Sequence, residues 1–558
     1  MVECLRIGIA QTNPHVGDVA GNIERVLSAR EALKDCDLIV TSELEVSGYP
    51  PEDLVLKKRF LDAVEAGVGR LIEATKDGGP AILVGAPWRD ESLNPFQGRA
   101  FNAALLLDQG AIRAVRYKHL LPNYSVFDEM RVFERGLLPE PVPFRGVNLG
   151  IMVCEDMWSP PVSKHLAEAG ADVLIALNGS PFDVSKIESR YAYARNRTAE
   201  TGLDLLYTNF VGGQDELVFD GGSFIMGADG LRKQQLPWFE TKVAEARLEK
   251  TTDGWRFMAT EPLAEPDPLL ENIYQAVQLG LRDYVGKNGF PGVVLGLSGG
   301  VDSALSAAIA VDALGPNKVR CVMMPSPYTS QESLDDAAGC GDMLGVSVET
   351  INIGPAMEAF ETMLAPAFAG KEADITEENI QARARGLTLM ALSNKFGHML
   401  LTTGNKSEMS VGYATLYGDM CGGFSVLKDL YKTTVFALCR WRNENKPKGS
   451  LGPDGPVMPE NVITKPPTAE LRDNQKDSDS LPDYDDLDAV LQVLVEDEGS
   501  VADALAAGLD EATVRRIWLL LDRAEYKRRQ APPGVKISKR AFGRERRYPL
   551  TNGFTLQA

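Results

Sequence analysis

The chain has 558 residues, 44% of them hydrophobic and 24% charged, so we expect a globular protein of roughly two to four domains. Its formal net charge of −20 argues against nucleic acid as the main partner, and no apolar run is long enough to cross a membrane. The seven cysteines are scattered without a CxxC pair, which indicates reduced thiols in a cytoplasmic protein and argues against disulfides or structural zinc.

From Arg6 to about Gly230, short β-rich runs alternate with helical stretches, which predicts an α/β layered fold. The predicted strands are residues 7–10, 38–42, 82–86, 103–107, 150–154, 173–177, 205–210 and 223–226. The predicted helices include residues 22–34 and 186–201. A segment rich in proline and acids, residues 263–268, is expected to be a linker. We therefore predict two domains, residues 1–260 and residues 261–558.

Cys154 ends the apolar run 150–154, at the point where a predicted buried strand opens into polar residues. A nucleophilic cysteine needs a base and positive charge nearby. The chain has only four histidines, and the residues around them do not indicate a catalytic role. Glu43 is therefore a candidate base, and Lys118 is a candidate cation that could stabilise a thiolate and an oxyanion. Taken singly, Cys154 could equally be a core residue, and Glu43 or Lys118 a surface charge.

Three segments around these residues, 43–50, 118–133 and 153–158, resemble three blocks of the nitrilase (carbon–nitrogen hydrolase) superfamily and occur in the same order. The resemblance implies an αββα sandwich with Glu43, Lys118 and Cys154 as the catalytic triad. Ser42 departs from the pattern, since many members have proline before the glutamate. The implied reaction is attack of the thiol on a carboxamide, which gives a thioester and ammonia. Candidates for holding the substrate, glutamine, are Tyr124, Glu129, Ser180 and Lys186, each of which could also be loop structure.

In the second half, residues 293–297 predict a buried strand and residues 304–314 a helix. The turn between them directs backbone N–H groups, hydroxyls and a helix N-terminus at one small volume, which should attract phosphate. No lysine follows the glycines, so this is not a Walker-type loop. It resembles the SGGxDS pyrophosphate-binding loop of the ATP pyrophosphatase (adenylating) family, which implies a doubly wound parallel sheet. The loop residues are Ser298, Gly299, Gly300, Val301, Asp302 and Ser303.

Further polar residues follow this loop. Asp302 and Glu408 could hold Mg²⁺, a hard ion that prefers carboxylate and phosphate oxygens. A predicted helix carries Arg383 and Arg385, which suit phosphate or carboxylate. Residues 443–467, rich in Pro, Gly, Lys and Asn, are expected to form an exposed insertion or mobile loop.

Together, six segments of the second half are similar to NAD synthetases: residues 298–303, 325–330, 379–385, 403–408, 417–432 and 465–471. With the first half included, the chain resembles the glutamine-dependent NAD synthetase family over nearly its whole length. The resemblance implies that ATP adenylates deamido-NAD, that ammonia from glutamine then gives NAD, and that a homo-oligomer, a dimer or larger, forms. It assigns the 298–303 loop, Arg383 and Thr403 to ATP, Asp302 and Glu408 to Mg²⁺, and Asn379, Glu408, Asp419 and Lys432 to the dinucleotide.

Ammonia is mostly protonated at neutral pH, so we also expect a protected route for it between Cys154 and the 298–303 loop. Three alternatives remain open. The chain could be an amidotransferase that adenylates a different acid. Its first half could be a catalytically silent scaffold. Modification of tRNA is a third possibility, against which the acidic charge and the lack of a zinc motif argue.

Overall fold

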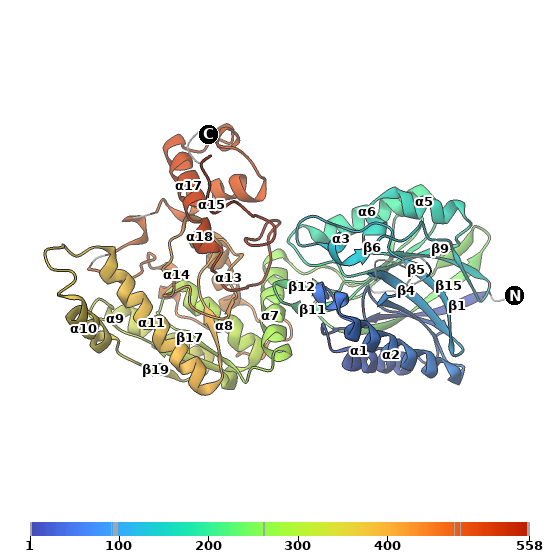
Figure 1. Ribbon diagram of the computed structural model, residues 1–558, viewed down its shortest axis with the longest axis horizontal. Coiled ribbons are helices and arrows are strands. Elements are labelled where there is room, and N and C mark those ends of the chain that lie inside the picture. Colours follow the sequence, from blue (N-terminus) through green and yellow to red (C-terminus); the bar gives the residue numbers. More distant parts are fainter. Residues whose placement is uncertain are drawn as a thin grey trace. The chain divides into compact units, whose positions relative to one another are not determined.

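The computed structural model describes residues 3–90, 92, 99–259, 263–473, 475–479 and 481–554. It divides into two compact units, Met1–Asp267 (unit 1) and Pro268–Ala558 (unit 2), which are described separately (Figure 1). The domain boundary predicted between residues 260 and 261 lies outside the described residues, and the division into units falls a few residues after it. Within the part of the chain that the structure describes, no helix is both long and apolar enough to cross a membrane.

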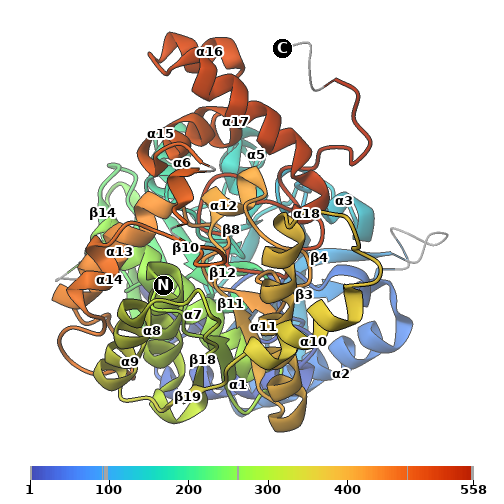
Figure 2. The same cartoon turned by 90° about the vertical axis from the view of Figure 1, so that its left-hand side faces the viewer.

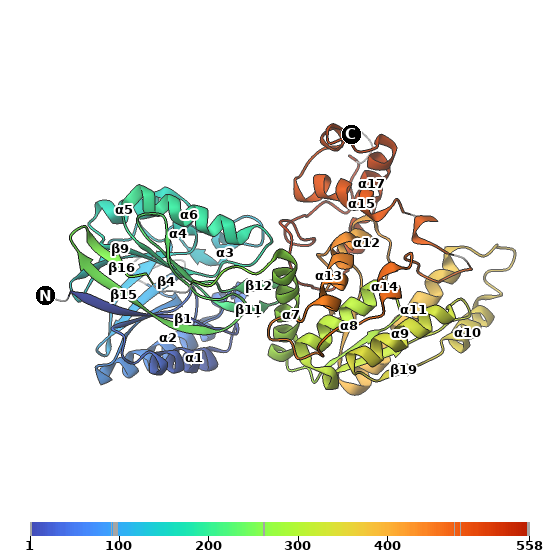
Figure 3. The same cartoon turned by 180° about the vertical axis from the view of Figure 1, so that it is seen from behind.

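Two β-sheets form the centre of unit 1 (Figure 3). The first sheet has the strand order β16-β15-β1-β2-β3-β4-β5, with β6 paired to β4. Its strands are β1 (Cys4–Gln11), β2 (Leu38–Val40), β3 (Ala81–Trp88), β4 (Ala100–Asp108), β5 (Ala111–Tyr117), β6 (Phe133–Glu134), β15 (Lys242–Thr251) and β16 (Gly254–Phe257). The second sheet has the order β14-β13-β10-β9-β8-β7. Its strands are β7 (Val142–Phe144), β8 (Val147–Val153), β9 (Val173–Asn178), β10 (Leu205–Asn209), β13 (Phe224–Met226) and β14 (Arg232–Gln235).

The inner faces of the two sheets share one apolar core, and helices cover the outer faces. Alternation along β3 illustrates this: Leu83 packs between the sheets, whereas Ile82 and Val84 pack under the helices. The covering helices are α1 (Val19–Ala32) and α2 (Lys58–Ala74) on the first sheet, and α5 (Pro160–Glu168) and α6 (Lys186–Thr201) on the second (Figures 1 and 3). The αββα sandwich predicted from the sequence is confirmed. The shorter elements are η1 (Glu52–Leu56), η2 (Thr75–Asp77), α3 (Glu129–Val132), α4 (Glu155–Trp158) and the hairpin β11 (Val211–Gln214) with β12 (Leu217–Asp220).

Unit 2 contains a parallel sheet in the order β19-β18-β17-β20-β21. Its strands are β17 (Val293–Gly296), β18 (Val319–Met323), β19 (Val348–Thr350), β20 (Met399–Thr402) and β21 (Phe424–Ser425). The chain moves outward from β17 to β19 and then returns to the other side of β17 with β20. The strand order therefore reverses between β17 and β20, and ligands of such sheets bind at the carboxyl ends of the strands at this point.

Helices lie on both faces of this sheet (Figures 1 and 2). On one face, Leu389 of α11 packs against Val294, Val322 and Leu400 of three neighbouring strands. On the other face lies α8, which contacts α7 and α13. The doubly wound parallel sheet predicted from the sequence is confirmed. The helices are α7 (Leu269–Lys287), α8 (Val301–Leu314), η3 (Pro316–Lys318), α9 (Gln331–Leu344), α10 (Gly354–Leu364), α11 (Ile375–Phe396), α12 (Lys406–Val411), α13 (Lys432–Glu444), α14 (Glu460–Thr464), η4 (Asp477–Asp479), α15 (Tyr484–Leu491), η5 (Gln492–Glu496, a π-helix), α16 (Val501–Ala506), α17 (Glu511–Arg523) and α18 (Glu525–Arg528).

The exposed loop expected over residues 443–467 is confirmed in part: its backbone is largely irregular and stretches such as 444–446 and 454–456 are exposed, but other parts of it are anchored in the interior. The guanidinium of Arg442 is fully buried, pairs with Asp312 and donates hydrogen bonds to the carbonyls of Pro453 and Gly455. Further along the segment, Val457 and Met458 are buried as well. Proline and glycine do predict irregular backbone here, but composition does not reveal that a buried arginine satisfies the carbonyls of the loop.

Candidate active sites

In unit 1, the ends of three strands bring Glu43, Lys118 and Cys154 together. Glu43 follows β2, Lys118 follows β5 and Cys154 follows β8, and none of the three is more than 4% exposed. The Oε1 atom of Glu43 accepts hydrogen bonds from Lys118 Nζ at 2.7 Å and from Asn102 Nδ2 at 2.7 Å. Its Oε2 atom accepts one from the backbone N–H of Gly179 at 2.8 Å. The carboxylate of Glu43 is thus held in one orientation by three donors.

Cys154 lies between β8 and α4 with a φ of +44°, in a region that non-glycine residues rarely occupy. Such strain is retained where the surrounding structure fixes the backbone, often at functional sites. Burial raises the pKa of the Cys154 thiol well above its usual range, the charge of Glu43 raises it further and Lys118 offsets only part of this. The resting thiol is therefore protonated and needs a base before it can react.

Lys118 is paired with two carboxylates. Its Nζ atom lies 2.8 Å from Glu129 Oε1, which also accepts a hydrogen bond from the hydroxyl of Tyr49 at 2.9 Å. Burial alone would lower the pKa of Lys118, but Glu129 and Glu43 outweigh it and hold this pKa well above its usual range. Glu129, predicted to contact glutamine, is thus placed by the structure against Lys118, and its role toward glutamine stays a prediction.

Asp156 joins the segment of Lys118 to that of Cys154. Its carboxylate accepts hydrogen bonds from the backbone N–H groups of His119, Leu120 and Val153 at 3.1, 2.8 and 3.2 Å. Asp156 is not among the residues predicted from the sequence. Its position two residues after the candidate nucleophile Cys154 could have indicated it.

Tyr124 and Lys186, both predicted to contact glutamine, each contact a residue of the segment that follows Cys154. The exposed Tyr124 hydroxyl donates to the carboxylate of Glu155, 3.0 Å from Oε2, and Glu155 directly follows Cys154 in the chain. The Lys186 ammonium lies 4.8 Å from the ring centre of Trp158. Glu155 was also missed from the sequence, although it is adjacent to the candidate nucleophile.

Ser180, the remaining residue predicted to contact glutamine, is buried and held on both sides. Its backbone N–H donates to Asn209 Oδ1 at 3.0 Å, and its hydroxyl accepts a hydrogen bond from Arg190 Nε at 3.2 Å. Arg190 also pairs with Asp220 at 2.7 Å and donates to the carbonyl of Ser180. Arg190 therefore fixes this turn.

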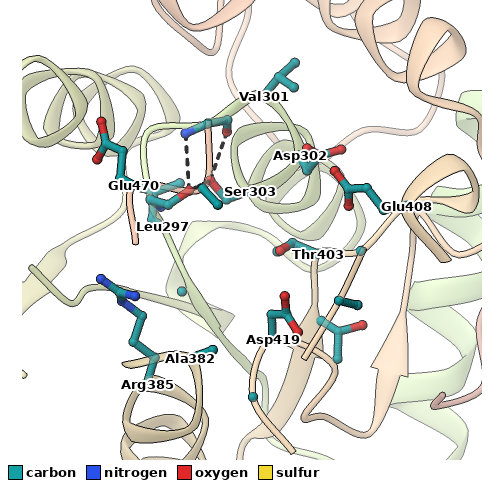
Figure 4. A pocket seen from close by; sticks show the side chains of 18 of the residues that line it. Leu297, Val301, Asp302, Ser303, Ala382, Arg385, Thr403, Glu408, Asp419 and Glu470 are labelled. Carbon is teal, nitrogen blue, oxygen red and sulfur yellow. Dashed lines mark hydrogen bonds between the residues drawn. The ribbon is translucent and has the colours of Figure 1, made fainter. Parts of the chain in front are cut away.

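Unit 2 contains a cavity of about 320 Å³ at the carboxyl ends of β17 and β20, where the strand order reverses (Figure 4). Its wall includes apolar residues such as Leu297, Val322, Leu334 and Leu389. The residues predicted from the sequence that line it are Ser298, Gly300, Val301, Asp302, Ser303, Thr403, Glu408, Asp419 and Lys432. Three others, Gly299, Asn379 and Arg383, are not part of its lining.

The 298–303 loop is held by its own hydroxyls. The Ser298 N–H donates to Ser303 Oγ at 3.2 Å, and the Ser303 hydroxyl donates to the carbonyl of Gly300 at 2.9 Å. Gly299 has a φ of +80°, and a Cβ atom there would lie 2.2 Å from the carbonyl oxygen of Ser333. Only glycine is therefore compatible with this backbone position. Gly299 itself packs against Ser333 and does not line the cavity.

The two candidate metal ligands lie side by side in the cavity (Figure 4). The ammonium of Lys432 lies 2.5 Å from Asp302 Oδ2 and 3.1 Å from Glu408 Oε1, and Asn405 Nδ2 donates to Asp302 Oδ1 at 2.9 Å. Burial raises the pKa of Glu408 to about 7, Lys432 opposes this rise and Asp302 adds to it. Two adjacent carboxylates open to a cavity suit a hard divalent ion. Because the described residues contain no cluster of three or more potential ligands, phosphate and water would have to supply the remaining ones.

Of the two arginines on α11, Arg385 and not Arg383 lines the cavity. Arg385 Nε donates to the carbonyl of Met324 at 3.1 Å, and burial lowers the pKa of its guanidinium. Arg383 is exposed and donates to the carbonyl of Leu416 at 3.2 Å. The lining residues of α11 are Ala382, Arg385, Gly386 and Leu389, a spacing of i, i+3, i+4 and i+7 that the sequence already contains.

Asn379 and Asp419 share a partner in Thr415. The Thr415 hydroxyl donates to Asn379 Oδ1 at 2.9 Å, and its backbone N–H donates to Asp419 Oδ1 at 2.6 Å. Asp419 is exposed and lines the cavity, whereas Asn379 supports the segment that carries it. The assignment of both residues to a dinucleotide stays a prediction.

Residues 465–471 cover part of the cavity and are fastened to the start of α9. Glu470 accepts hydrogen bonds from the hydroxyls of Ser330 at 2.7 Å and Ser333 at 2.8 Å. Lys465 pairs with Asp336 at 2.7 Å. Ser333 also supplies the carbonyl that packs against Gly299, so this serine touches both the covering segment and the 298–303 loop.

Comparison with known proteins agrees with this division into two sites. Residues 6–257 match the carbon-nitrogen hydrolase family and residues 273–531 match the NAD synthase family. The chain is 49% identical over 554 residues to the glutamine-dependent NAD(+) synthetase of Rhodobacter capsulatus, with 99% of each chain covered. This chain belongs to the glutamine-dependent NAD(+) synthetase family.

Other glutamine-dependent NAD(+) synthetases are similar over the same length. The one from Acinetobacter baylyi is 44% identical, with 99% of both chains covered. A solved structure of the glutamine-dependent NAD+ synthetase from Acinetobacter baumannii, in complex with ADP, superposes with a TM-score of 0.78 at 41% identity and 99% coverage of both chains. The family predicted from the sequence is thus confirmed.

Proposed function

We propose that the chain makes NAD(+) from deamido-NAD, with glutamine as the nitrogen donor and ATP as the activating co-substrate, as a ligase of NAD biosynthesis. Unit 1 releases ammonia from glutamine, and unit 2 activates and amidates the dinucleotide. The observation that carries this proposal is the presence, in one chain, of a buried Glu43–Lys118–Cys154 cluster and of a phosphate-type loop at the switch point of a parallel sheet.

In unit 1, Glu43 removes the proton of the Cys154 thiol as the sulfur attacks the carboxamide carbon of glutamine. Lys118, whose pKa stays high, and a backbone N–H stabilise the oxyanion. When the C–N bond breaks, Glu43 returns the proton to the leaving nitrogen, and ammonia departs. Water then attacks the thioester, Glu43 again takes a proton, and glutamate leaves with the thiol restored. Glu129 keeps Lys118 in place by its 2.8 Å contact.

The amino-acid end of glutamine carries one charge of each sign, and the region around Cys154 offers both. We assign the carboxylate of Glu155 and the hydroxyl of Tyr124 to its ammonium group. We assign Lys186 to its carboxylate, with Ser180 as a further hydrogen-bonding group. Both assignments follow from charge complementarity at the positions described above.

In unit 2, the carboxylate of deamido-NAD attacks the α-phosphorus of ATP, and pyrophosphate leaves toward the backbone N–H groups of the 298–303 loop. Ammonia then attacks the carbonyl carbon of the adenylate, and AMP leaves. We assign to Arg385, which lines the cavity, the ATP-binding role that the family resemblance implied for Arg383, and we assign Thr403, which also lines it, to ATP. We assign Asp419 and Lys432, which also line the cavity, to the dinucleotide and its activated carboxylate.

Mg²⁺ would be held by Asp302 and Glu408, and when bound it neutralises negative charge on the phosphates. This chain's own cations, Lys432 and Arg385, supply positive charge in the same cavity. We also propose that the protein acts in the cytoplasm as a homo-oligomer, a dimer or larger. Its seven cysteines are all free thiols, and light scattering of the purified protein would give the assembly's mass.

Replacement of the nucleophile tests the division of labour. The Cys154→Ala variant should lose NAD(+) formation from glutamine but keep it with added ammonium salt, and omission of Mg²⁺ should stop synthesis from either nitrogen source. The variant Cys36→Ala, which removes another buried cysteine of unit 1, is the matched control and should keep both activities. Glutamine-supported synthesis by Cys154→Ala would contradict the proposal and favour a silent first unit.

A further inference from the structure

Lys406, two residues before Glu408, has no part in the reaction described above, yet its ammonium is fully buried and paired with several groups. It lies 2.8 Å from Asp429 Oδ1, 2.6 Å from Ser538 Oγ and 2.8 Å from the carbonyl of Arg540, and it also pairs with Glu496. An ammonium has only three protons to donate, so these acceptors use all of them. A buried cation in such a cluster has a fixed position, because removal of one partner leaves uncompensated charge.

Asn405, directly before Lys406, and Glu408, two residues after it, connect Lys406 to the synthetase site. Asn405 donates to Asp302, and its Oδ1 atom accepts the backbone N–H of Glu408 at 3.0 Å, which caps helix α12. Helix α12 has only six residues, so its own hydrogen bonds are too few to fix its N-terminus. The anchoring of Lys406 therefore bears directly on where the Glu408 carboxylate lies.

Two of the partners of Lys406, the Ser538 hydroxyl and the Arg540 carbonyl, lie in a C-terminal segment, residues 535–540, which we call the C-terminal strap. Asp429 Oδ2 accepts the backbone N–H groups of Ile537 and Ser538, both at 2.7 Å. Glu496 Oε2 accepts the backbone N–H of Arg540 at 3.0 Å. Glu496 ends the π-helix η5, a rare conformation that is often found near functional sites. The strap is thus bonded to the two carboxylates that surround Lys406.

The same cluster also anchors a second segment of the cavity wall. Asp429 follows Lys428 and lies three residues before Lys432, and both lysines line the cavity. The backbone N–H of Lys406 donates to the carbonyl of Leu430 at 2.8 Å, which ties α12 to this segment. One buried cluster thereby holds two parts of the wall that carry the cations and the carboxylates.

We propose that Lys406 is a positioning residue that links the C-terminal strap to the Asp302–Glu408 carboxylate pair, so that the strap sets how tightly unit 2 holds its divalent metal with nucleotide. This inference rests on the proposed role of that pair in the synthetase reaction. It assigns a function to the strap, which the contacts described above connect to the cavity wall through Lys406 and Asp429.

The test measures Mn²⁺ affinity by electron paramagnetic resonance in the full chain with a non-hydrolysable ATP analogue, together with ammonium-supported NAD(+) synthesis. The Lys406→Met variant should bind Mn²⁺ about tenfold more weakly and show a lower kcat, because the Glu408 carboxylate is no longer held in place. The Ser538→Ala variant removes one acceptor of Lys406 and should shift the affinity in the same direction, by about two- to fivefold. Glutamine hydrolysis should be unchanged in both variants.

A matched control is Arg442→Met, which removes another fully buried cation of unit 2 whose partner Asp312 does not line the cavity. It should lower the unfolding temperature without changing the Mn²⁺ affinity. Equal weakening of Mn²⁺ binding by Arg442→Met and Lys406→Met would mean that Lys406 only stabilises the fold of unit 2, and it would overturn the proposal. If Lys406→Met does not fold, an unchanged affinity in Ser538→Ala overturns it. Failure of the chain to make NAD(+) would contradict the proposed function instead, since metal affinity is measured independently of turnover.

Discussion

At the scale of single residues, the candidate glutaminase site buries two carboxylates with one ammonium. One ammonium, that of Lys118, is shared by the carboxylates of Glu43 and Glu129, beside a Cys154 thiol whose pKa burial keeps high. The cation therefore stays charged, whereas the thiol stays neutral until a base acts on it. In the mechanism proposed above, Glu43 would remove the proton and Lys118 would stabilise the oxyanion.

The role of Glu129 can be decided by kinetics. If Glu129 positions Lys118, Glu129→Gln should lower kcat for glutamine hydrolysis by about a hundredfold with little change in KM, because the oxyanion donor is misplaced. The exposed neighbour Asp128 provides the control, and Asp128→Asn should leave both constants unchanged. A large rise in KM with a normal kcat would instead support the glutamine contact predicted from the sequence.

Glu45 should make the stability of unit 1 depend on pH. Its side chain is fully buried, and burial raises its pKa to about 7, while the hydrogen bond from the Thr12 hydroxyl at 2.5 Å offsets only part of this. In the unfolded chain a glutamate has a pKa of about 4.3. Between these values the folded protein binds more protons than the unfolded one, so the free energy of unfolding falls as pH rises, by up to about 3 kcal/mol.

The variant Glu45→Gln lacks this titration. Its unfolding temperature relative to that of the wild type should therefore increase by several degrees between pH 5 and pH 8, as measured by calorimetry. Glu168→Gln, at an exposed position of α5, should show a constant difference over the same range. A pH-independent difference for Glu45→Gln would mean that Glu45 is ionised throughout.

At the scale of elements, the sequence predicted the positions of the site residues where they follow buried strands. Runs of apolar residues identified β2, β8 and β17, and Glu43, Cys154 and the 298–303 loop follow the predicted ends of these strands. Strands such as β5, β15 and β16 were missed because they lie toward the edge of the first sheet, where half-exposed polar residues weaken the apolar pattern. The fold class could be predicted because the central strands, whose apolar runs are clear in the sequence, are sufficient to recognise it.

The orientation of individual side chains was harder to predict. Arg383 and Arg385 lie about 200° apart around α11, so only one of them can face the sheet, and the spacing of the buried residues would have selected Arg385. Lys406 contacts Ser538 of the C-terminal strap, 132 positions away, and Glu129 reaches Lys118, 11 positions away, across irregular backbone. No local pattern encodes such contacts, because they depend on how separate segments pack.

The two central glycines of the 298–303 loop should differ in their tolerance of a side chain. Gly299→Ala should destabilise unit 2 by about 2 kcal/mol or more and abolish NAD(+) synthesis, because its φ is +80° and its Cβ would strike the Ser333 carbonyl. Gly300→Ala, with a φ of −88° and its nearest contact at 3.4 Å, should fold with an unchanged unfolding temperature. Calorimetry and ammonium-supported synthesis measure both effects, and equal destabilisation by the two variants would contradict the prediction.

At the scale of the whole molecule, each unit has its own core and its own candidate site, matched by a separate family. Damage to one site should therefore spare the chemistry of the other. What the two units share is ammonia, the product of unit 1 and a substrate of unit 2. Because most free ammonia is protonated at neutral pH and does not react, direct transfer would raise the rate of synthesis.

Isotope labelling measures that transfer. With amide-¹⁵N glutamine and an excess of unlabelled ammonium salt, direct transfer predicts that NAD(+) carries mostly ¹⁵N, as determined by mass spectrometry. In the same mixture, Cys154→Ala should give only unlabelled NAD(+). Label diluted to the level of the bulk ammonium would show that ammonia equilibrates with solvent before it reacts.

Ser333 contacts two separate parts of the wall of the synthetase cavity. Its carbonyl packs on Gly299 beneath the phosphate loop, and its hydroxyl is bonded to Glu470 in the covering segment. Ser333 of α9 therefore contacts the 298–303 loop and the covering segment at once. If the loop shifts when pyrophosphate leaves, we expect the shift to disturb the attachment of residues 465–471 as well, so that release of the first product would favour release of the second.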